Sequence, residues 1–266
     1  MFTDRPPAAY LIDLDGTLYT GGEAMPGAVA ALARLRAAGI PFRLVTNTTS
    51  RSRRMLVERL ARLGFAVEAA ELYTATMAGA DLAACEGYRR VVPFVPEAAL
   101  EDLAGLDLAG GTSGRRSPPG WHADAVVIGD LGERWTHGVM QAAFEHLMAG
   151  AALVALSRDR YWLRDGRLTL DAGAFVAGLE YASGRPAAVA GKPGPRFFAA
   201  AVAALGGPGA AEVAMVGDDL WSDVAGAQGA GLRGWLVRTG KFRPDALETS
   251  GVTPDRILGS VAEVPA

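Results

Sequence analysis

The stretch Tyr10-Leu11-Ile12-Asp13-Leu14-Asp15-Gly16-Thr17-Leu18 joins a short apolar run to two carboxylates and a glycine. Short apolar runs of this kind are typical of strands that are buried on both faces of a parallel sheet. Other apolar runs end in the same way: 42–45 before Thr46-Asn47, 187–190 before Gly191-Lys192, and 213–216 before Gly217-Asp218-Asp219. We therefore predict core strands at these places, followed by a last strand at 234–238.

Helical segments separate the expected strands. Apolar residues recur at helical spacing, with glycine or proline at the ends, over 27–38, 52–63, 195–205 and 223–230. This alternation predicts a doubly wound α/β fold around a parallel sheet. Ligands of such sheets bind at the carboxyl ends of the strands, which is where the polar residues after each apolar run fall.

The spacing of the polar motifs predicts a second domain. Asp15 and Thr46 are 31 residues apart and Lys192 and Asp218 are 26 apart, whereas Asn47 and Lys192 are 145 apart. A strand–helix–strand unit takes about 30 residues or a little more, so roughly 100 residues must be inserted. We place an inserted α/β cap domain at 77–183, which leaves 1–76 and 184–266 as the two parts of the core domain.

The inserted segment has α/β patterning of its own. Apolar runs predict strands at 90–95, 123–128 and 153–156, and a helix at 138–148 with Thr136 as its N-cap. The dipeptide Asp165-Gly166 lies between 161–163 and 168–170, which predicts a β-hairpin with a type I′ turn.

The overall composition excludes several classes of protein. The 26 basic and 29 acidic residues give a formal charge of −3, so we expect neither nucleic acid nor a membrane surface as partner. A single cysteine, Cys85, excludes a disulfide framework and a cysteine-based zinc cluster. With no signal peptide and no long apolar span in view, we expect a cytoplasmic protein.

Carboxylates gather at the expected edge of the core sheet. Asp13 and Asp15 follow one strand, and Asp218, Asp219 and Asp223 follow another. Turn formation or helix N-terminal acidity explains each motif taken alone. Five carboxylates at one edge would repel one another unless a divalent cation were present. Their hard oxygen ligands favour Mg²⁺ over zinc.

Two further motifs at this edge suit a phosphate. The hydroxyls and backbone N–H groups of Thr46-Asn47-Thr48-Thr49 precede a helix and could bind an anion, although N-capping explains them as well. Lys192 and Lys241 are the only lysines among the 26 basic residues. That scarcity favours a specific need for an ammonium at Lys192 over a solvated surface lysine.

The order of these motifs resembles the haloacid dehalogenase-like (HAD) phosphohydrolase superfamily. The place of the insert, between the Thr46 and Lys192 motifs, resembles its subfamily IIA, the NagD-like phosphatases with a large α/β cap. Several stretches are similar to the branch of haloacid dehalogenase-like hydrolase domain-containing protein 2 and phospholysine phosphohistidine inorganic pyrophosphate phosphatase. These stretches are Thr46-Asn47-Thr48-Thr49, Val216-Gly217-Asp218-Asp219, Gly226-Ala227-Gln228 and Arg238-Thr239-Gly240-Lys241-Phe242-Arg243.

The resemblance implies a Rossmann-like core and an Mg²⁺-dependent phosphatase that cleaves small phosphate monoesters. Asp13 would be the nucleophile that forms an aspartyl-phosphate, and Asp15 would be the general acid and base. Mg²⁺ would be held by the Asp13 and Asp218 carboxylates and the Asp15 backbone carbonyl. Asp219 and Asp223 would support this site.

The resemblance also implies how substrate is held. Thr46, Asn47 and Lys192 would bind the phosphoryl oxygens, and the cap would select the leaving group. The residues themselves suggest Arg158 and Arg160, which follow a predicted cap strand, as candidates for that selection. A solvated hairpin with an aromatic core face is the simpler interpretation of the same segment. We expect a small phosphorylated metabolite as substrate, and a homodimer formed through the cap is a candidate assembly.

The nearest branch departs from this chain at one position. Members of that branch often carry serine where this chain has Asp15, which fits substrates whose leaving group needs a proton, such as alkyl phosphates. The alternatives are a pyrophosphate or phosphoramidate phosphatase and a catalytically weak binding protein on the same fold. Cleavage of a C–P bond is disfavoured, because the family's phosphonate chemistry needs a cap lysine and 77–183 contains none.

Overall fold

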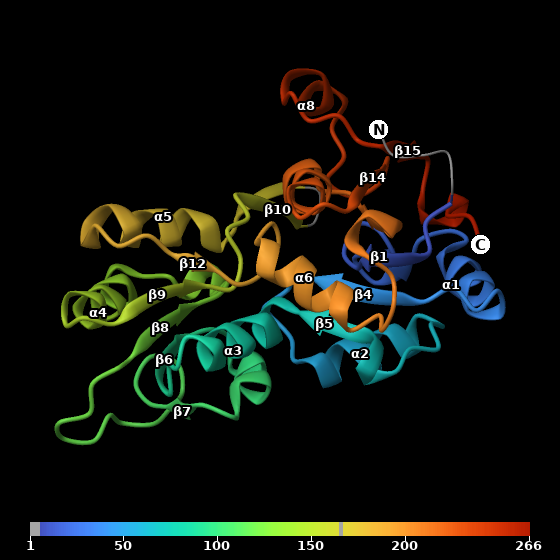
Figure 1. Cartoon of the computed structure of the whole chain (residues 1–266). Helices are drawn as coiled ribbons and strands as arrows, with labels where there is room; N and C mark the ends of the chain where they lie inside the picture. Colours follow the sequence, from blue (N-terminus) through green and yellow to red (C-terminus); the bar gives the residue numbers. More distant parts are fainter. Residues whose placement is uncertain (1–5, 165–166) are drawn as a thin grey trace. The chain divides into compact units, whose positions relative to one another are not determined.

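The chain divides into two compact units in the computed structural model, which describes residues 6–164 and 167–266 (Figure 1). The first unit comprises Met1–Thr46, Leu56–Tyr73 and Lys192–Ala266, and the second comprises Asn47–Met55 and Thr74–Gly191. The cap predicted at 77–183 lies inside the second unit, which is wider because it also takes in Asn47–Met55, residues 74–76 and residues 184–191. The last of these segments was expected to belong to the core part at 184–266.

The first unit is built on a six-stranded sheet in the order β15-β14-β13-β1-β4-β5. Its strands are β1 (Ala9–Asp13), β4 (Phe42–Thr46), β5 (Leu72–Thr74), β13 (Val213–Gly217), β14 (Arg233–Val237) and β15 (Arg256–Leu258). The pairs from β15 through β4 are parallel. A small antiparallel hairpin of β2 (Tyr19–Thr20) and β3 (Glu23–Ala24) follows β1.

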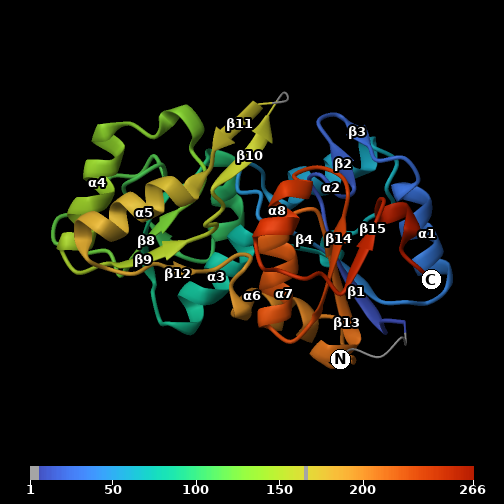
Figure 2. The same ribbon diagram turned by 90° about the horizontal axis from the view of Figure 1, so that it is seen from above.

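Helices cover both faces of this sheet. They are α1 (Ala28–Ala37), α2 (Arg53–Arg62), α6 (Pro195–Ala203), α7 (Gly226–Gly229) and α8 (Pro244–Thr249), with a π-helix, η5 (Leu220–Ala225), before α7. The first two share one apolar core with alternate residues of the strands, among them Tyr10, Ile12 and Leu44. Helices α1 and α7 lie on opposite sides of the sheet (Figure 2). The predicted doubly wound core is therefore confirmed.

The second unit has its own five-stranded parallel sheet in the order β12-β9-β8-β6-β7. Its strands are β6 (Arg90–Phe94), β7 (Asp107–Leu108), β8 (Ala125–Ile128), β9 (Ala152–Ala155) and β12 (Ala188–Val189). Its helices are α3 (Ala75–Cys85), α4 (His137–Met148) and α5 (Ala172–Ser183). The Thr136 hydroxyl caps α4 by accepting the Val139 N–H, as predicted.

The hairpin predicted in this segment is also present. It consists of β10 (Tyr161–Arg164) and β11 (Arg167–Leu170), which pair antiparallel. The predicted turn at Asp165-Gly166 lies outside the described residues. The chain also contains short 3₁₀ helices at Ala69–Glu71, Glu97–Leu103, Gly132–Arg134, Ala210–Glu212 and Val261–Glu263.

One strand prediction is wrong. The run at 187–190 was expected to be a strand of the core sheet, but β12 pairs with β9 at the edge of the second unit's sheet. An apolar run indicates a strand without showing which sheet receives it, and β12, as an edge strand, is not buried: Ala188 is exposed and Val189 is half-buried. Lys192, three residues after β12, already belongs to the first unit.

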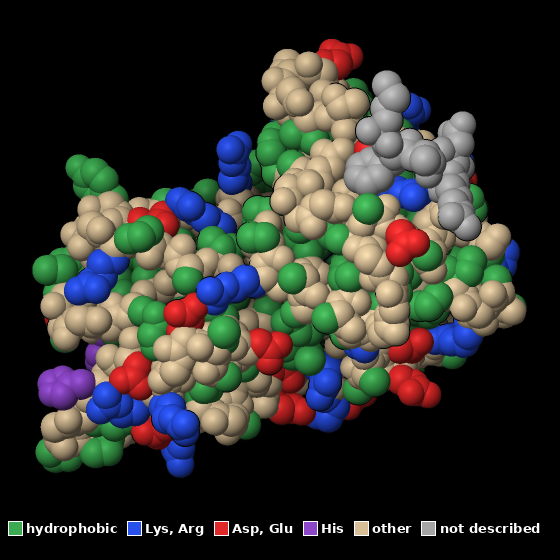
Figure 3. Space-filling model, in the orientation of Figure 1, with side chains coloured by type: hydrophobic (Ala, Val, Ile, Leu, Met, Phe, Trp, Pro, Cys, Tyr) green, Lys and Arg blue, Asp and Glu red, His purple; other side chains and the backbone are tan. Residues whose placement is uncertain are grey.

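The charges on one face of the molecule and the lengths of the described helices are both ordinary for a globular protein of mixed charge. On the face shown in Figure 3, Lys and Arg side chains are interspersed with those of Asp and Glu. Among the described helices, none is both long enough and apolar enough to cross a membrane.

We predict that Leu35→Ala lowers the free energy of unfolding by about 2–5 kcal/mol, because Leu35 of α1 is fully buried in the core of the first unit. Val29→Ala on the same helix is the matched control. Val29 is 37% exposed, so its truncation should cost no more than about 0.5 kcal/mol. Denaturant unfolding monitored by circular dichroism measures both, and equal costs would contradict the packing described here.

Candidate active site

The polar end of β1 begins the site. Asp13 is the last residue of β1 and its side chain is buried, whereas Asp15 is exposed. The chain turns at once, because Leu14 carbonyl oxygen accepts the N–H groups of Thr17 and Leu18 and Gly16 has a positive φ of 85°. The turn keeps Asp13 facing the sheet edge.

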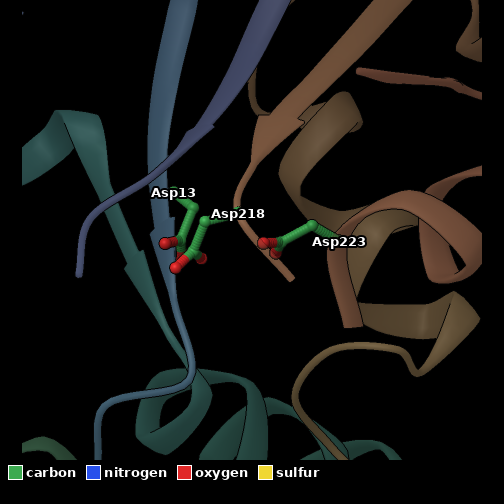
Figure 4. A group of neighbouring side chains, drawn as sticks. All are labelled: Asp13, Asp218 and Asp223. Carbon is green, nitrogen blue, oxygen red and sulfur yellow. The ribbon is translucent and has the colours of Figure 1, made fainter. Parts of the chain in front are cut away.

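Two further carboxylates meet Asp13 there. Asp218 directly follows β13, and Asp223 lies in η5. Each of the three offers an oxygen, and these oxygens lie within 4.8 Å of one another. Figure 4 shows the carboxylates of Asp13 and Asp218 side by side, with that of Asp223 directed toward them.

The ammonium of Lys192 joins two of these carboxylates. Its Nζ lies 2.5 Å from Asp13 Oδ1 and 2.6 Å from Asp223 Oδ1, and the side chain is only 3% exposed. Lys192 therefore lies beside the aspartates, as the sequence predicted. The strand that precedes it, β12, belongs to the sheet of the second unit and not to the core sheet that was expected.

Burial dominates the electrostatics of this cluster. It raises the pKa of Asp13 to about 7, even though Lys192 acts to lower it. Burial also raises the pKa values of Asp218 and Asp223. For Lys192, burial acts to lower the pKa, but the charges of Asp13 and Asp223 outweigh it and raise the pKa.

The donor set fits a hard divalent cation. When ionised, Asp13, Asp218 and Asp223 carry three negative charges, and Lys192 balances one of them. The remaining two match one divalent ion, and carboxylate oxygens are the ligands that Mg²⁺ or Ca²⁺ takes in proteins. Neither sulfur nor imidazole belongs to the cluster, which disfavours zinc.

The hydroxyl of Tyr19 orients the Asp15 carboxylate. Tyr19 Oη donates a hydrogen bond to Asp15 Oδ2 over 3.0 Å. Burial and the Asp15 charge raise the pKa of Tyr19, so the hydroxyl keeps its proton. The guanidinium of Arg59 lies 4.7 Å from the centre of the Tyr19 ring and donates to the Gly21 carbonyl. These contacts fix the ring, and with it the donor to Asp15.

Asp219 lies beside the cluster with partners of its own. Its Oδ1 accepts the N–H groups of Trp221 and Ser222, so it caps η5, and its Oδ2 lies 3.1 Å from Lys241 Nζ. Burial acts to raise the pKa of Asp219, but Lys241 and the Ser222 N–H outweigh it and lower the pKa. Asp219 thus orders the helix that carries Asp223.

The predicted phosphate-binding residues fall in different units. Thr46 ends β4 in the first unit and is buried. Asn47 belongs to the second unit, where its Nδ2 donates to Asp159 Oδ1 at 3.2 Å and to Ser157 Oγ at 3.4 Å. The core cluster of carboxylates and Lys192 therefore lies wholly within the first unit, and the role of Asn47 stays a prediction.

The candidate cap residues lie between β9 and β10. Arg158 forms an ion pair with Glu180 of α5 over 2.6 Å, and its side chain is 48% exposed. Arg160 is exposed. Their selection of a leaving group stays a prediction.

Sequence patterns missed two residues of the site. Tyr19 looked like part of the apolar run after the aspartates, and its hydroxyl was the only sign of another use. Lys241 shares the scarcity of lysine that drew attention to Lys192, and that signal could have found it.

Comparison with known proteins places this fold and site in a family. Residues 10–109 match the model of haloacid dehalogenase-like hydrolases, and residues 189–264 match a second, HAD-hydrolase-like model. Haloacid dehalogenase-like hydrolase domain-containing protein 2 of Bos taurus is 41% identical over 91% of this chain and 88% of its own length. Phospholysine phosphohistidine inorganic pyrophosphate phosphatase of Rattus norvegicus is 36% identical over 95% and 91%.

Solved structures give the same result. NagD from Escherichia coli superposes with a TM-score of 0.83 at 27% identity, covering 98% of this chain and 99% of NagD. A glycerol phosphate phosphatase from Mycobacterium tuberculosis, solved in complex with magnesium, has a TM-score of 0.82 at 30% identity over 96% of this chain and 75% of its own.

The chain therefore belongs to the haloacid dehalogenase-like hydrolase family. Within that family it resembles the NagD-like members, and the predicted class of enzyme, a HAD-type phosphatase, is confirmed.

The raised pKa of Asp218 leads to a prediction about pH. A carboxyl whose folded pKa exceeds its unfolded value of about 3.9 contributes stability below that value and loses it as pH rises through the folded pKa. In chelator-treated protein, Asp218→Asn should therefore gain stability relative to the parent as the pH rises from 4.5 to 8, because only the parent must ionise a buried carboxyl.

Thermal and denaturant unfolding at the two pH values measure this difference. Asp245→Asn is the control, because Asp245 is exposed and Arg243 lowers its pKa, so its effect should not change above pH 4.5. A constant difference between Asp218→Asn and the parent would contradict the burial of ionisable Asp218.

Proposed function

We propose that the protein is an Mg²⁺-dependent phosphohydrolase that cleaves small phosphate monoesters through an aspartyl-phosphate on Asp13. The observation that carries this proposal is the buried group of Asp13, Asp218 and Asp223 around the Lys192 ammonium, 2.5 Å from Asp13. A carboxylate held beside a cation at the carboxyl edge of a parallel sheet suits nucleophilic attack on a phosphoryl group.

The carboxylates of Asp13 and Asp218 and the backbone carbonyl of Asp15 would hold Mg²⁺. When bound, the ion offsets the repulsion between a carboxylate nucleophile and the phosphoryl oxygens. The structure of the similar glycerol phosphate phosphatase contains magnesium, which supports this choice of ion.

The chain's own residues carry the two chemical steps. A carboxylate oxygen of Asp13 attacks phosphorus, the bond from phosphorus to the leaving oxygen breaks, and Asp15 gives that oxygen its proton. A water molecule then attacks phosphorus, Asp15 takes a proton from it, and the Asp13 carboxylate is released with inorganic phosphate. Tyr19 keeps Asp15 oriented throughout, through the hydrogen bond to its Oδ2.

Positive charge and hydrogen-bond donors would receive the phosphoryl oxygens. The Lys192 ammonium already lies between Asp13 and Asp223, so it can stabilise negative charge that develops in the transition state. The Thr46 hydroxyl and the Asn47 backbone N–H would supply further donors. A small phosphorylated metabolite is the substrate that this set suits.

Two classes of leaving group are candidates for the substrate. Asp15 favours alkyl phosphates, whose leaving oxygen needs a proton, and Arg158 and Arg160 stay the candidate residues for selecting that group. The alternative is a pyrophosphate or phosphoramidate, the substrates that the name of the rat relative gives to that protein. Parallel assays with glycerol phosphate, pyrophosphate and phospholysine separate the two.

We predict that Asp13→Asn lowers phosphatase turnover by several orders of magnitude, because an amide cannot act as the nucleophile. The parent enzyme should hydrolyse p-nitrophenyl phosphate with Mg²⁺ and lose this activity after exhaustive chelation. Asp245→Asn, an exposed change on α8, is the control and should retain activity. Substantial turnover by folded Asp13→Asn, or activity that survives chelation, would contradict the proposal.

We predict that Asp15→Asn depresses hydrolysis of an alkyl phosphate by about 10²–10⁴-fold, the usual contribution of general acid–base catalysis. An activated aryl phosphate should suffer less in the phosphorylation step, since its leaving group departs without a proton. Tyr19→Phe should shift rates in the same direction by a smaller factor.

Single-turnover phosphorylation with leaving groups of graded pKa is the measurement, because it isolates the first step from dephosphorylation. The Asp15→Asn variant should show a steeper dependence on leaving-group pKa than the parent. Equal slopes would mean that Asp15 gives the leaving group no proton.

A further inference from the structure

The turn after β14 holds the loop that follows β1. Thr239 Oγ1 donates a hydrogen bond of 2.5 Å to the carbonyl oxygen of Gly16. Two residues later, the backbone N–H of Lys241 donates to Asp218 Oδ2 over 2.6 Å. One short turn thus reaches both the Asp13–Gly16 loop and a carboxylate of the cluster.

Glycine makes this close approach possible. A Cβ on Gly16 would lie 2.0 Å from Asp218 Oδ2, and a Cβ on Gly240 would lie 1.9 Å from the same oxygen. Both distances are far below van der Waals contact. The Asp218 carboxylate is therefore packed between two Cα atoms and has little freedom to rotate.

The Lys241 side chain extends the contact to the next element. Its Nζ lies 3.1 Å from Asp219 Oδ2, and Asp219 Oδ1 caps the helix η5 that carries Asp223. Lys241 therefore touches the carboxylate next to Asp218 with its side chain and Asp218 itself with its backbone.

We propose that the turn Thr239–Lys241 is a clamp that holds Asp218 in place to bind the divalent cation, with Thr239 and Lys241 as positioning residues. This inference rests on the proposed function. Like charges in the cluster drive Asp218 away from Asp13, and the clamp opposes that movement before the cation arrives. Its donors and packing thus preorganise the site, so binding costs less reorganisation.

Outer partners of metal ligands contribute about 10–100-fold to metal affinity, which sets the size of the expected effect. Thr239→Val keeps the shape of the side chain and removes the donor to Gly16, so it should weaken Mg²⁺ binding by a factor in that range. Thr239→Ser keeps the hydroxyl and should bind Mg²⁺ nearly as the parent does. Lys241→Met should also weaken Mg²⁺ binding, because it removes the ammonium that joins the turn to Asp219 and so loosens the clamp.

The glycine pair supplies a matched comparison. Gly240→Ala places a Cβ against Asp218, and it should bind Mg²⁺ much more weakly than the parent. Gly251 has a similar positive φ, 73° against 57° for Gly240, but no atom lies within 4 Å of its Cβ position. Gly251→Ala therefore carries the same backbone strain without the clash, and its Mg²⁺ affinity should be unchanged.

Calorimetric titration of MgCl₂ into the chelator-treated chain of 266 residues measures affinity without any substrate, and circular dichroism checks that each variant is folded. Weaker binding by folded Thr239→Val, with recovery in Thr239→Ser, supports the clamp even where Gly240→Ala does not fold. Parent-like affinity in Thr239→Val and Lys241→Met overturns the clamp and leaves the proposed function intact. Failure of the parent to bind Mg²⁺ overturns the proposed metal site and the clamp with it.

Discussion

The ammonium of Lys192, buried between Asp13 and Asp223, is the contact on which the site depends. A buried carboxylate without a partner is costly, and three buried carboxylates gather here, two of them paired with this ammonium. Lys192 balances one of the three negative charges of the ionised carboxylates, and the two that remain match the charge of one divalent ion. In the proposed reaction, the same ammonium that stabilises the resting cluster would also bind the oxygens of the transferred group.

The scaffold serves this cluster by bringing separate segments to one sheet edge. Neighbouring parallel strands β1 and β13 deliver Asp13 and Asp218, and η5 delivers Asp223. The approach is close enough that side chains at Gly16 and Gly240 would collide with Asp218. The segments that match the two family models, 10–109 and 189–264, include every residue of the cluster.

Sequence patterns predicted the strands that carry the aspartates, because buried strands followed by acidic residues are distinctive. They failed at 187–190, since the second unit has a parallel sheet of its own and an edge strand there has the same apolar composition as a core strand. They grouped Asp219 with the other aspartates, whereas its side chain caps η5. Tyr19 and Lys241 were missed as site residues because their roles depend on contacts with the preceding turn and with a distant loop, which no local periodicity encodes.

In the proposed reaction, Asp13 attacks phosphorus and carries the phosphoryl group during turnover. Rapid quenching of the Mg²⁺-loaded enzyme during hydrolysis of an aryl phosphate, followed by peptide mass spectrometry, locates that group directly. The account predicts a phosphorylated peptide containing Asp13, formed and lost at rates that support steady-state turnover. A phosphoryl group on another residue would contradict the account, as would turnover with no phosphoenzyme and direct transfer of the phosphoryl group to water.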